Sequence, residues 1–595
     1  MTTPNSLYAL LDWFTDHEIW WDEEALDVVH LTDGATPLVR ASARHSPTLP
    51  TGPPAGLLVS GTGMGVVARR RLEEEEVVVR IPKSAVLSPK SSGIANIIED
   101  EELAGGIALT LSVMFELARG PHSPWYGYLN SLPQEVYIPV LWQPHQLALL
   151  EGTDLARDLI NDRQELASDY QELILPIVTK HPDVFTPPEA FTFDRFLQVT
   201  SMVTSRAFQV DNYHGDAMVP FADLFNHLTG GEHVHIEAEA DVCVVCGESG
   251  GCEHTIAEDD DGETDAELKV KEVSDNDSDT CMEAVPLDDP SVMVSGPPTG
   301  RATDGNDSDN ESFESVEEDA MDMRVYRPVQ AGHEVFNTYG VHSAAYLLHR
   351  YGFADHHNPQ DVVTIEFPAL VALAERQANA LPADHRRRVA NLYLRHHPVF
   401  LISERLDGLE SSREEEEETL NFFSITHEGT LDARLLLVLL LLHHGDAELG
   451  DLEAKPKAAH RYFTALLQWL ANLGPILLVS SGARPRPAKS RRTMASKRTT
   501  GRIAVATSTC PMAARALALV KTRPEILAAA FTNLLELIQE RTARHMSDKE
   551  FRDLEPQDDA QDRLCYEHAR TLRDSELAIL ARAQARYQRY LAELA

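Results

Sequence analysis

Residues 218–227 read MVPFADLFNH, and residues 332–340 read GHEVFNTYG. The first stretch is an apolar run that ends in Asn226 and His227, whose side chains and backbone can form hydrogen bonds with a ligand. A helix end capped by Asn226 is the alternative. The second stretch ends at Tyr339-Gly340, and further aromatic residues follow it. Although the two stretches lie far apart in the chain, we expect them to form one site.

A glycine-rich run, Gly61-Thr62-Gly63-Met64-Gly65, stands near the start of the chain. Alternating glycines let a backbone approach a ligand closely. The run precedes a predicted strand, whereas the dinucleotide-binding fingerprint follows a strand and opens a helix. A Rossmann-type fold is therefore not expected, and a plain β-turn is the alternative for this run alone.

In this order, the three segments resemble the SET-domain methyltransferases. They are most similar to the branch of the Rubisco large-subunit methyltransferase and the ribosomal-protein lysine methyltransferases. The resemblance covers roughly residues 5–235 and 322–366. It implies an α+β fold, with a β-rich SET core that holds a helical insert, followed by an all-α substrate-binding domain. It also implies S-adenosylmethionine as the cofactor and methyl transfer to a lysine of a basic non-histone protein, with a ribosomal protein as the first candidate.

The resemblance assigns roles to individual residues. Those implied to bind the cofactor are Thr62, Gly63, Met64, Arg206, Asn226, His227, Tyr351 and Phe353. Within this set Arg206 would pair with the cofactor carboxylate, for which a surface salt bridge is the alternative. Those implied to face the substrate are Phe208, Asp223 and Tyr339. Asp223 could equally be a structural hydrogen-bond acceptor.

Tyr339 is the residue that the resemblance places at the chemistry. A lysine amine must lose its proton before it can accept a methyl group, and lysine titrates near ~10.4 in water. An aromatic channel beside a positively charged sulfur lowers that pKa through desolvation and like charge. The Tyr339 hydroxyl can then hold the amine in line with the methyl group. Core packing is the alternative for any single tyrosine.

One position departs from the family pattern. Relatives usually have Ser-Asn after the catalytic tyrosine, whereas this chain has Ser343-Ala344, so one side-chain hydrogen bond near the site is expected to be missing. Two other functions stay open. Histidine methylation on the same fold would need polar residues that fix an imidazole ring, and a non-catalytic SET-fold protein-binding module is favoured only by Ala344.

A separate cluster, Cys243-x-x-Cys246-x5-Cys252-x-His254, has the residue types of a zinc site. Three thiolates and one imidazole can complete a tetrahedral shell. The gap of five residues between Cys246 and Cys252 is short for a zinc finger, and no second half of such a finger follows. A flexible loop with free thiols is therefore the alternative. We predict a structural zinc rather than a catalytic one, because methyl transfer from a sulfonium needs no Lewis acid.

Charge is distributed unevenly along the 595 residues, whose net charge is −42. Residues 256–320 contain 22 acidic and 3 basic residues, so 3 − 22 gives −19 for this segment. Such a composition predicts a disordered acidic insertion. It favours a basic protein partner and argues against nucleic acid and an anionic membrane. The basic stretch 483–502 is expected to be an exposed loop that serves as a nuclear-import signal, folds onto the acidic insertion, or is simply solvated.

The expected organisation has two domains. Residues 1–366 would form the SET domain, with a helical insert at about 94–210 and the acidic insertion at about 240–322, and residues 367–595 would form the helical domain. Helices are expected over 6–30, 431–444, 458–473, 524–546 and 574–594, and β structure over 56–82 and 362–365.

The remaining expectations concern location and assembly. The longest apolar stretch, 435–442, is too short to cross a membrane and predicts a buried helix. The N-terminal residues lack the pattern of a signal peptide, and six cysteines in this length do not suggest a disulfide framework. We expect a monomeric protein of the cytoplasm, the nucleus or both.

Overall fold

A computed structural model of the chain describes the following residues: 4–30, 63–133, 135–238, 242–248, 252, 254, 319–376, 383–396, 422–456, 459, 462–463, 524–556 and 559–594. Several expectations lie outside these residues. They concern Gly61 and Thr62, nearly all of the acidic insertion, most of the helix expected over 458–473, and the basic stretch 483–502. Among the described helices, none is long and apolar enough to span a bilayer.

The N-terminal segment contains one helix and two strands. Helix α1 (Pro4–Asp16) buries Leu10 and Phe14 in the core. Strands β1 (Trp20–Trp21) and β2 (Leu26–His30) follow, so the helix expected over 6–30 is wrong beyond α1. The backbone turns at Glu18, where φ is +57°. The β-branched pair Val28-Val29 then favours a strand, which pairs with β3 (Met64–Ala68).

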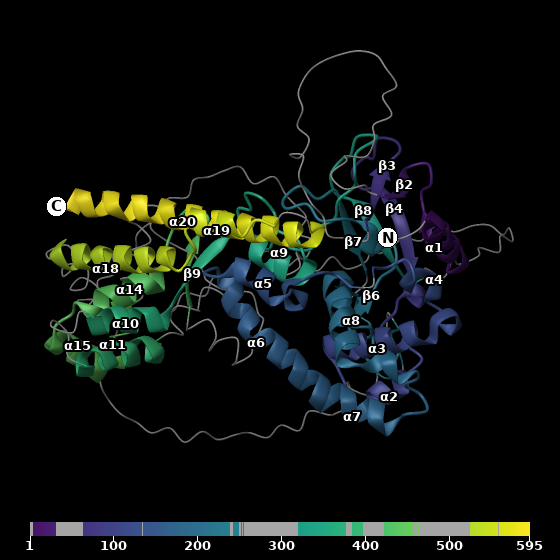
Figure 1. The fold of residues 1–595 in the computed structure, drawn as a ribbon, viewed down its shortest axis with the longest axis horizontal. Helices are drawn as coiled ribbons and strands as arrows, with labels where there is room; N and C mark the ends of the chain where they lie inside the picture. Colours follow the sequence, from purple (N-terminus) through teal and green to yellow (C-terminus); the bar gives the residue numbers. More distant parts are fainter. Residues whose placement is uncertain are drawn as a thin grey trace, which may run out of the picture.

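A four-stranded antiparallel sheet forms the main β layer (Figure 1). Its order is β1-β4-β8-β7, with β4 (Val77–Pro82), β7 (Val234–Glu237) and β8 (Ala320–Val325). Strands β7 and β8 are direct neighbours, with Val234 paired to Val325. The acidic insertion therefore leaves and re-enters the fold at adjacent strands of one sheet.

A group of helices lies between β4 and the first quoted stretch, as expected. It comprises α2 (Ala95–Asp100), α3 (Gly105–Arg119), α4 (Tyr126–Leu129), α5 (Pro144–Leu147), α6 (Asp154–Asp169), α7 (Leu175–Lys180) and α8 (Phe193–Arg206). Helices α3 and α8 pack against each other. Directly after α8, strands β5 (Ala207–Gln209) and β6 (Asp216–Met218) form a hairpin that leads into the site.

The C-terminal part is helical around one strand pair. Its helices are α10 (Phe367–Arg376), α11 (Ala383–His396), α14 (Ala433–Leu442), α15 (Asp446–Ala454), α18 (Pro524–Ala543), α19 (Asp548–Asp553) and α20 (Ala560–Leu594). The leucines of α14 are buried, which confirms the buried helix expected at 435–442. The expectation of helix alone was wrong at β10 (Phe422–Thr426), which pairs with β9 (Val362–Glu366) and alternates buried and half-buried residues.

Helix α20 packs against both parts of the chain (Figure 1). Its first half, including Tyr566 and Leu572, shares an apolar cluster with Trp142 and Leu348. Its second half lies beside α18 in the core of the C-terminal helices. Helix α20 thus packs on residues from both sides of the expected boundary at residue 366, and the two-domain division stays a proposal.

The observed architecture confirms the α+β fold class. The strands are short and antiparallel, and helices cover most of the remaining described chain.

Candidate active site

The two stretches quoted at the outset cross each other in the structure. The short helix Ala222–Leu224 lies near the end of the apolar run, and Asn226 and His227 follow it at the point where the two stretches cross. The Asn337 N–H donates to the Asn226 carbonyl at 2.8 Å, and the Leu228 N–H donates to the Asn337 carbonyl at 3.2 Å. These bonds form a parallel bridge between His227 and Asn337. The expectation that the two stretches meet is confirmed.

The crossing places the ring of His227 against Tyr339. The Tyr339 backbone N–H donates to His227 Nδ1 at 3.0 Å. Nδ1 is therefore an acceptor, so the ring proton is on Nε2, which lies 3.0 Å from the Thr229 hydroxyl. That hydroxyl donates in turn to Asp355. Burial, with a smaller contribution from His342, lowers the pKa of His227 to about 4, so the ring is neutral at pH 7.

Aromatic rings surround Tyr339. Tyr351 stacks on it with ring centres 4.6 Å apart, and Phe353 meets it edge-on at 6.4 Å. The Tyr339 hydroxyl donates a long hydrogen bond of 3.3 Å to the Phe225 carbonyl. Burial raises the pKa of Tyr339 to about 12 and also raises the pKa of Tyr351, so both hydroxyls keep their protons at neutral pH.

Arg206 and Asp223 form a buried ion pair beside this group. The Arg206 guanidinium donates to the Asp223 carbonyl at 3.1 Å and to its carboxylate at 3.3 Å. Tyr128 also donates to that carboxylate, at 3.0 Å. Arg206 is only 8% exposed, so the alternative of a surface salt bridge is wrong. Burial raises the pKa of Asp223, while Arg206 and Tyr128 act in the opposite direction.

Two polar atoms of this pair are left over. Arg206 Nε and Asp223 Oδ1 are buried and have no hydrogen-bond partner among the described residues. Buried polar atoms are normally satisfied, so a ligand is an obvious partner for them. One Asp223 oxygen thus accepts from Arg206 and Tyr128, while the other oxygen and Arg206 Nε remain for a ligand.

Asn226 joins all three quoted segments. Its amide donates to Glu334 at 2.7 Å and to the Met64 carbonyl at 3.4 Å. A helix-capping role for Asn226 is therefore wrong. The Val335 N–H donates to the Val66 carbonyl at 2.8 Å, which holds the strand after the glycine-rich run beside the second stretch. Gly63 has φ of +70°, a conformation that favours glycine.

The other substrate-facing candidate, Phe208, lies on β5 two residues after Arg206. It pairs with Ala217 of β6 and packs, half-buried, on the core of the N-terminal part.

The segment after Tyr339 is held by residues that sequence analysis missed. The Ala344 N–H donates to Asp361 at 2.7 Å, and Ser343 caps α9 (Ala344–Tyr351). The Asn358 amide donates to the His342 carbonyl at 2.8 Å. The loop 355–361, rich in Asp, Asn and Pro, was the available signal for these contacts. The backbone at Ala344 is thus fixed without an asparagine side chain there.

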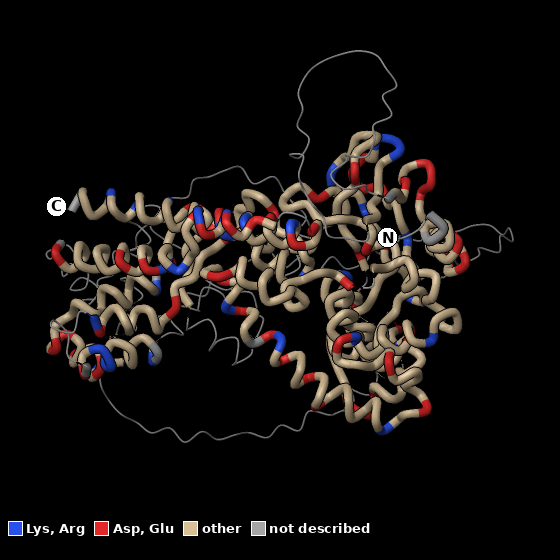
Figure 2. The backbone as a smooth tube through the Cα atoms, in the orientation of Figure 1, with Lys and Arg blue, Asp and Glu red and all other residues tan. Residues whose placement is uncertain are grey.

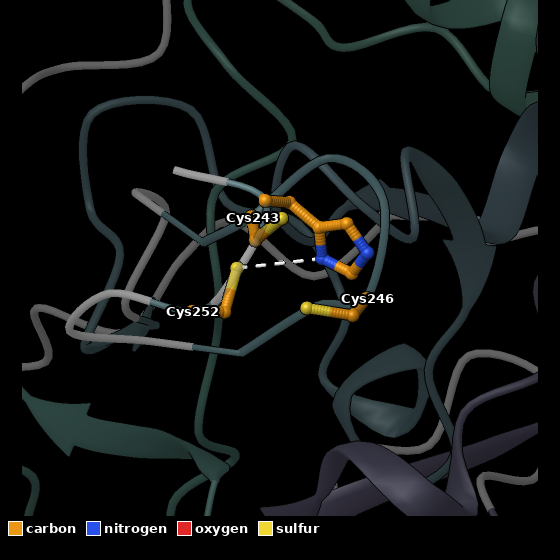
Figure 3. A group of neighbouring side chains, drawn as sticks. Cys243, Cys246 and Cys252 are labelled. Carbon is orange, nitrogen blue, oxygen red and sulfur yellow. Dashed lines mark hydrogen bonds between the residues drawn. The ribbon is translucent and has the colours of Figure 1, made fainter. Parts of the chain in front are cut away.

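The cysteine cluster lies apart from these residues, at the beginning of the insertion. The candidate ligand atoms of Cys243, Cys246, Cys252 and His254 all lie within 4.8 Å of one another. Figure 3 shows the three labelled thiols turned toward a common centre, with Cys252 Sγ 3.5 Å from His254 Nδ1.

Comparison with known proteins gives three informative sequence relatives, although no protein-family model matches the chain. Ribosomal lysine N-methyltransferase 3 of Saccharomyces cerevisiae is 28% identical over 330 residues, which is 51% of this chain and 58% of that protein. N-lysine methyltransferase SETD6 of Homo sapiens is 30% identical over 198 residues, which is 30% of this chain and 41% of that protein. The chloroplastic [fructose-bisphosphate aldolase]-lysine N-methyltransferase of Arabidopsis thaliana is 32% identical over 168 residues, which is 28% of this chain and 34% of that protein. The chain thus spans between about a third and somewhat over half of these relatives.

Solved structures agree with the fold. The SET domain of LSMT bound to lysine and AdoHcy superposes with a TM-score of 0.53 at 16% identity, covering 100% of this chain and 93% of that one. Rubisco LSMT bound to AdoMet gives 0.52 at 16% identity, with the same coverage. The chain therefore has the fold of the LSMT SET domain, and its resemblance to the Rubisco methyltransferase-like branch of SET-domain proteins is confirmed.

Proposed function

We propose that the protein is an S-adenosylmethionine-dependent protein-lysine N-methyltransferase that acts on a basic non-histone protein. The observation that carries the proposal is the crossing of residues 225–228 with residues 337–339. It sets the Tyr339 hydroxyl within an aromatic group and beside the buried Arg206–Asp223 pair.

The chemistry of the site residues fits S-adenosylmethionine. This cofactor supplies a methyl group on a positively charged sulfur, and it also carries an amino acid carboxylate and an adenosine. Arg206 Nε is a buried donor that would bind the carboxylate. The backbone at Gly63 and Met64 would hold the methionine part, with Thr62 continuing the same run, and Asn226 and His227 would hold the remainder of the molecule.

The protein side chains would control the amine that is methylated. Tyr351 and Phe353 line the region of Tyr339 with rings that exclude water, which favours a neutral lysine amine. The Tyr339 hydroxyl hydrogen points to the Phe225 carbonyl. The lone pairs of its oxygen are then free to accept an amine N–H, which leaves the amine lone pair for the methyl group. The nitrogen must be held in line, roughly 3–3.5 Å from that carbon.

The proposed substrate follows from charge and from one relative. A net charge of −42 favours encounter with basic proteins. The segment 256–320 carries −19 of the −42, somewhat under half of the acidic excess. On the described residues, acidic and basic positions are interspersed along the backbone (Figure 2). The yeast relative is named for ribosomal lysine methylation, so we propose a ribosomal protein as the substrate class. A monomer in the cytoplasm, the nucleus or both is part of this proposal.

The proposal is tested by incubating the protein with isotope-labelled cofactor and a ribosomal fraction, followed by mass spectrometry of the labelled peptide. A labelled lysine supports the proposal. A labelled histidine would instead establish the imidazole-modifying alternative. Tight cofactor binding without any labelled product would favour a protein-binding module.

A further inference from the structure

We propose that Cys243, Cys246, Cys252 and His254 bind one structural zinc ion that fastens the start of the acidic insertion to the turn between β5 and β6. This inference does not rest on the proposed methyl transfer.

The cluster has the composition and size of a structural zinc site. Zinc binds thiolate sulfur at about 2.3 Å and imidazole nitrogen at about 2.0–2.1 Å, so tetrahedral ligands lie about 3.5–4 Å apart. The four candidate atoms already lie within 4.8 Å of one another, and the Cys252 Sγ–His254 Nδ1 pair is 3.5 Å apart. Small side-chain movements would close the shell.

The turn between Cys243 and Cys246 leaves its two central valines exposed. The Gly247 N–H donates to the Cys243 carbonyl at 2.8 Å, and the Cys243 N–H donates to the Glu248 carbonyl at 3.0 Å. Val244 and Val245 between the first two cysteines are 64% and 59% exposed, whereas Cys243 and Cys252 are each 9% exposed. Val242 is also buried, whereas Cys246 and His254 are exposed. The segment between the first two cysteines therefore has no buried apolar side chain of its own, and a metal bound by the converging donors accounts for its turn.

A disulfide is a poorer explanation for the same convergence. One disulfide would use two of the three thiols and leave the third, together with His254, beside it without a role. The four donors together match a Cys3His shell, in which every member is used.

The cluster rests on the β5–β6 turn. A Cβ added to Gly247 would lie only 2.9 Å from the ring of Tyr213, so the loop backbone sits directly against that ring. Tyr213 is held in its turn by Asp211, whose carboxylate accepts the N–H groups of Tyr213 at 2.9 Å and His214 at 2.7 Å.

The other end of the insertion is attached to the same turn. The Lys83 ammonium pairs with Asp211 at 2.8 Å and with Asp319, directly before β8, at 2.7 Å. The Lys83 side chain is buried and Asp319 is half-exposed, so an ammonium held inside the fold by Asp211 reaches Asp319 at the surface. The zinc ion would fix the start of the insertion, as Lys83 fixes its end at Asp319. Both ends of the acidic insertion would then be held at the β5–β6 turn.

Metal analysis of the freshly purified full-length protein tests the site. We expect about one zinc per chain, falling below about a tenth in Cys246→Ser and Cys252→Ser. Cys281→Ser, the same substitution outside the cluster, should keep the metal. His254→Cys should also keep it, because four thiolates form an equally suitable shell. Cobalt(II) in place of zinc should show the absorption of a tetrahedral thiolate complex.

Hydrogen–deuterium exchange tests the anchoring. Removal of zinc by a chelator should increase exchange in residues 207–218 and leave α14 and α18 unchanged. Metal-free protein, or zinc that persists in both Cys→Ser variants, would overturn the site. Bound zinc whose removal leaves exchange at 207–218 unchanged would overturn the anchoring role. If a Cys→Ser variant fails to fold, the His254→Cys variant and the chelation experiment on the wild-type chain still show whether the cluster binds zinc.

Discussion

The backbone N–H of Tyr339 donates a hydrogen bond to Nδ1 of His227 at 3.0 Å. This bond joins the two stretches of sequence that form the site, and it requires a neutral imidazole. A proton on Nδ1 would face the Tyr339 N–H and remove the bond. The position of the candidate catalytic tyrosine is therefore linked to the protonation state of a residue in the other stretch.

Lowering the pH should destabilise the fold through His227. Its pKa in the folded state, about 4, lies below the value near 6.5 of an unfolded chain. The unfolded state therefore binds more protons between these values. The contribution of His227 to the free energy of unfolding is complete above about pH 6.5 and is lost as the pH falls toward about 4. The expected loss between pH 7.5 and pH 5 is about 2 kcal/mol. Urea unfolding at the two pH values measures it.

His227→Asn provides the control for this prediction. The asparagine oxygen can accept the Tyr339 N–H but cannot be protonated in this range, so the variant should lose that part of the pH dependence. His568, also buried with a pKa lowered to about 4, is present in both proteins and cancels in the comparison. Equal pH dependence in the two proteins would contradict the assignment.

Tyr339→Phe should bind the cofactor almost normally and transfer methyl groups about 10²-fold more slowly, because one preorganised polar contact is lost. Calorimetry separates binding from chemistry. Tyr346→Phe is the matched control, since Tyr346 lies on α9 and stacks on His342 rather than on Tyr339. A normal rate in Tyr339→Phe would remove this residue from the chemistry.

Asn226→Ala should weaken both the fold and cofactor binding. The Glu334 carboxylate, whose pKa burial already raises, would lose the amide that lies 2.7 Å away. A buried group left unpaired costs about 1–3 kcal/mol. Glu334→Gln in the same background should recover part of the stability without restoring cofactor affinity. Unchanged stability and affinity in Asn226→Ala would show that the three segments are not held together by this residue.

Arg206→Met should destabilise the N-terminal part of the fold by about 3–5 kcal/mol, because Asp223 would stay buried without its cation. Arg206→Lys keeps the charge but loses Nε, so it should bind cofactor weakly with a smaller loss of stability. Thermal unfolding and calorimetry measure the two effects. Wild-type stability in Arg206→Met would contradict a buried pair.

Replacing residues 258–318 with a short Gly-Ser linker should preserve folding. It should also lower the rate of association with a basic substrate at low salt. In the intact chain, this electrostatic gain in association rate should fade as the Debye length falls from ~10 Å at 0.1 M salt to ~3 Å at 1 M. Extending the replacement to Asp319 should be more damaging, because Lys83 then loses a partner at 2.7 Å. Equal stability of the two versions would show that Asp319 does not anchor this end.

The meeting of the two quoted stretches was easier to predict from the sequence than the elements around them. The crossing could be expected because Asn226-His227 and Tyr339 lie in motifs that follow the order found in SET-domain methyltransferases. The helix expected over 6–30 was wrong because Trp20-Trp21 is a strand only through pairing with β4, which is distant in sequence. The bonds from Thr229 to Asp355 and from Ala344 to Asp361 were missed for the same reason. Strand β10, whose sequence Phe-Phe-Ser-Ile-Thr is rich in aromatic and β-branched residues, carries a local signal that our sequence analysis did not use.

The central claim is most directly tested by comparing wild-type protein with Tyr339→Phe in one methylation assay on a ribosomal fraction. Labelled cofactor, peptide mass spectrometry and a matched cofactor-binding measurement are used for both. The account predicts a methylated lysine with wild-type protein and about 10²-fold less with Tyr339→Phe at equal cofactor affinity. Methylation of another residue type, or equal lysine methylation by both proteins, would contradict it.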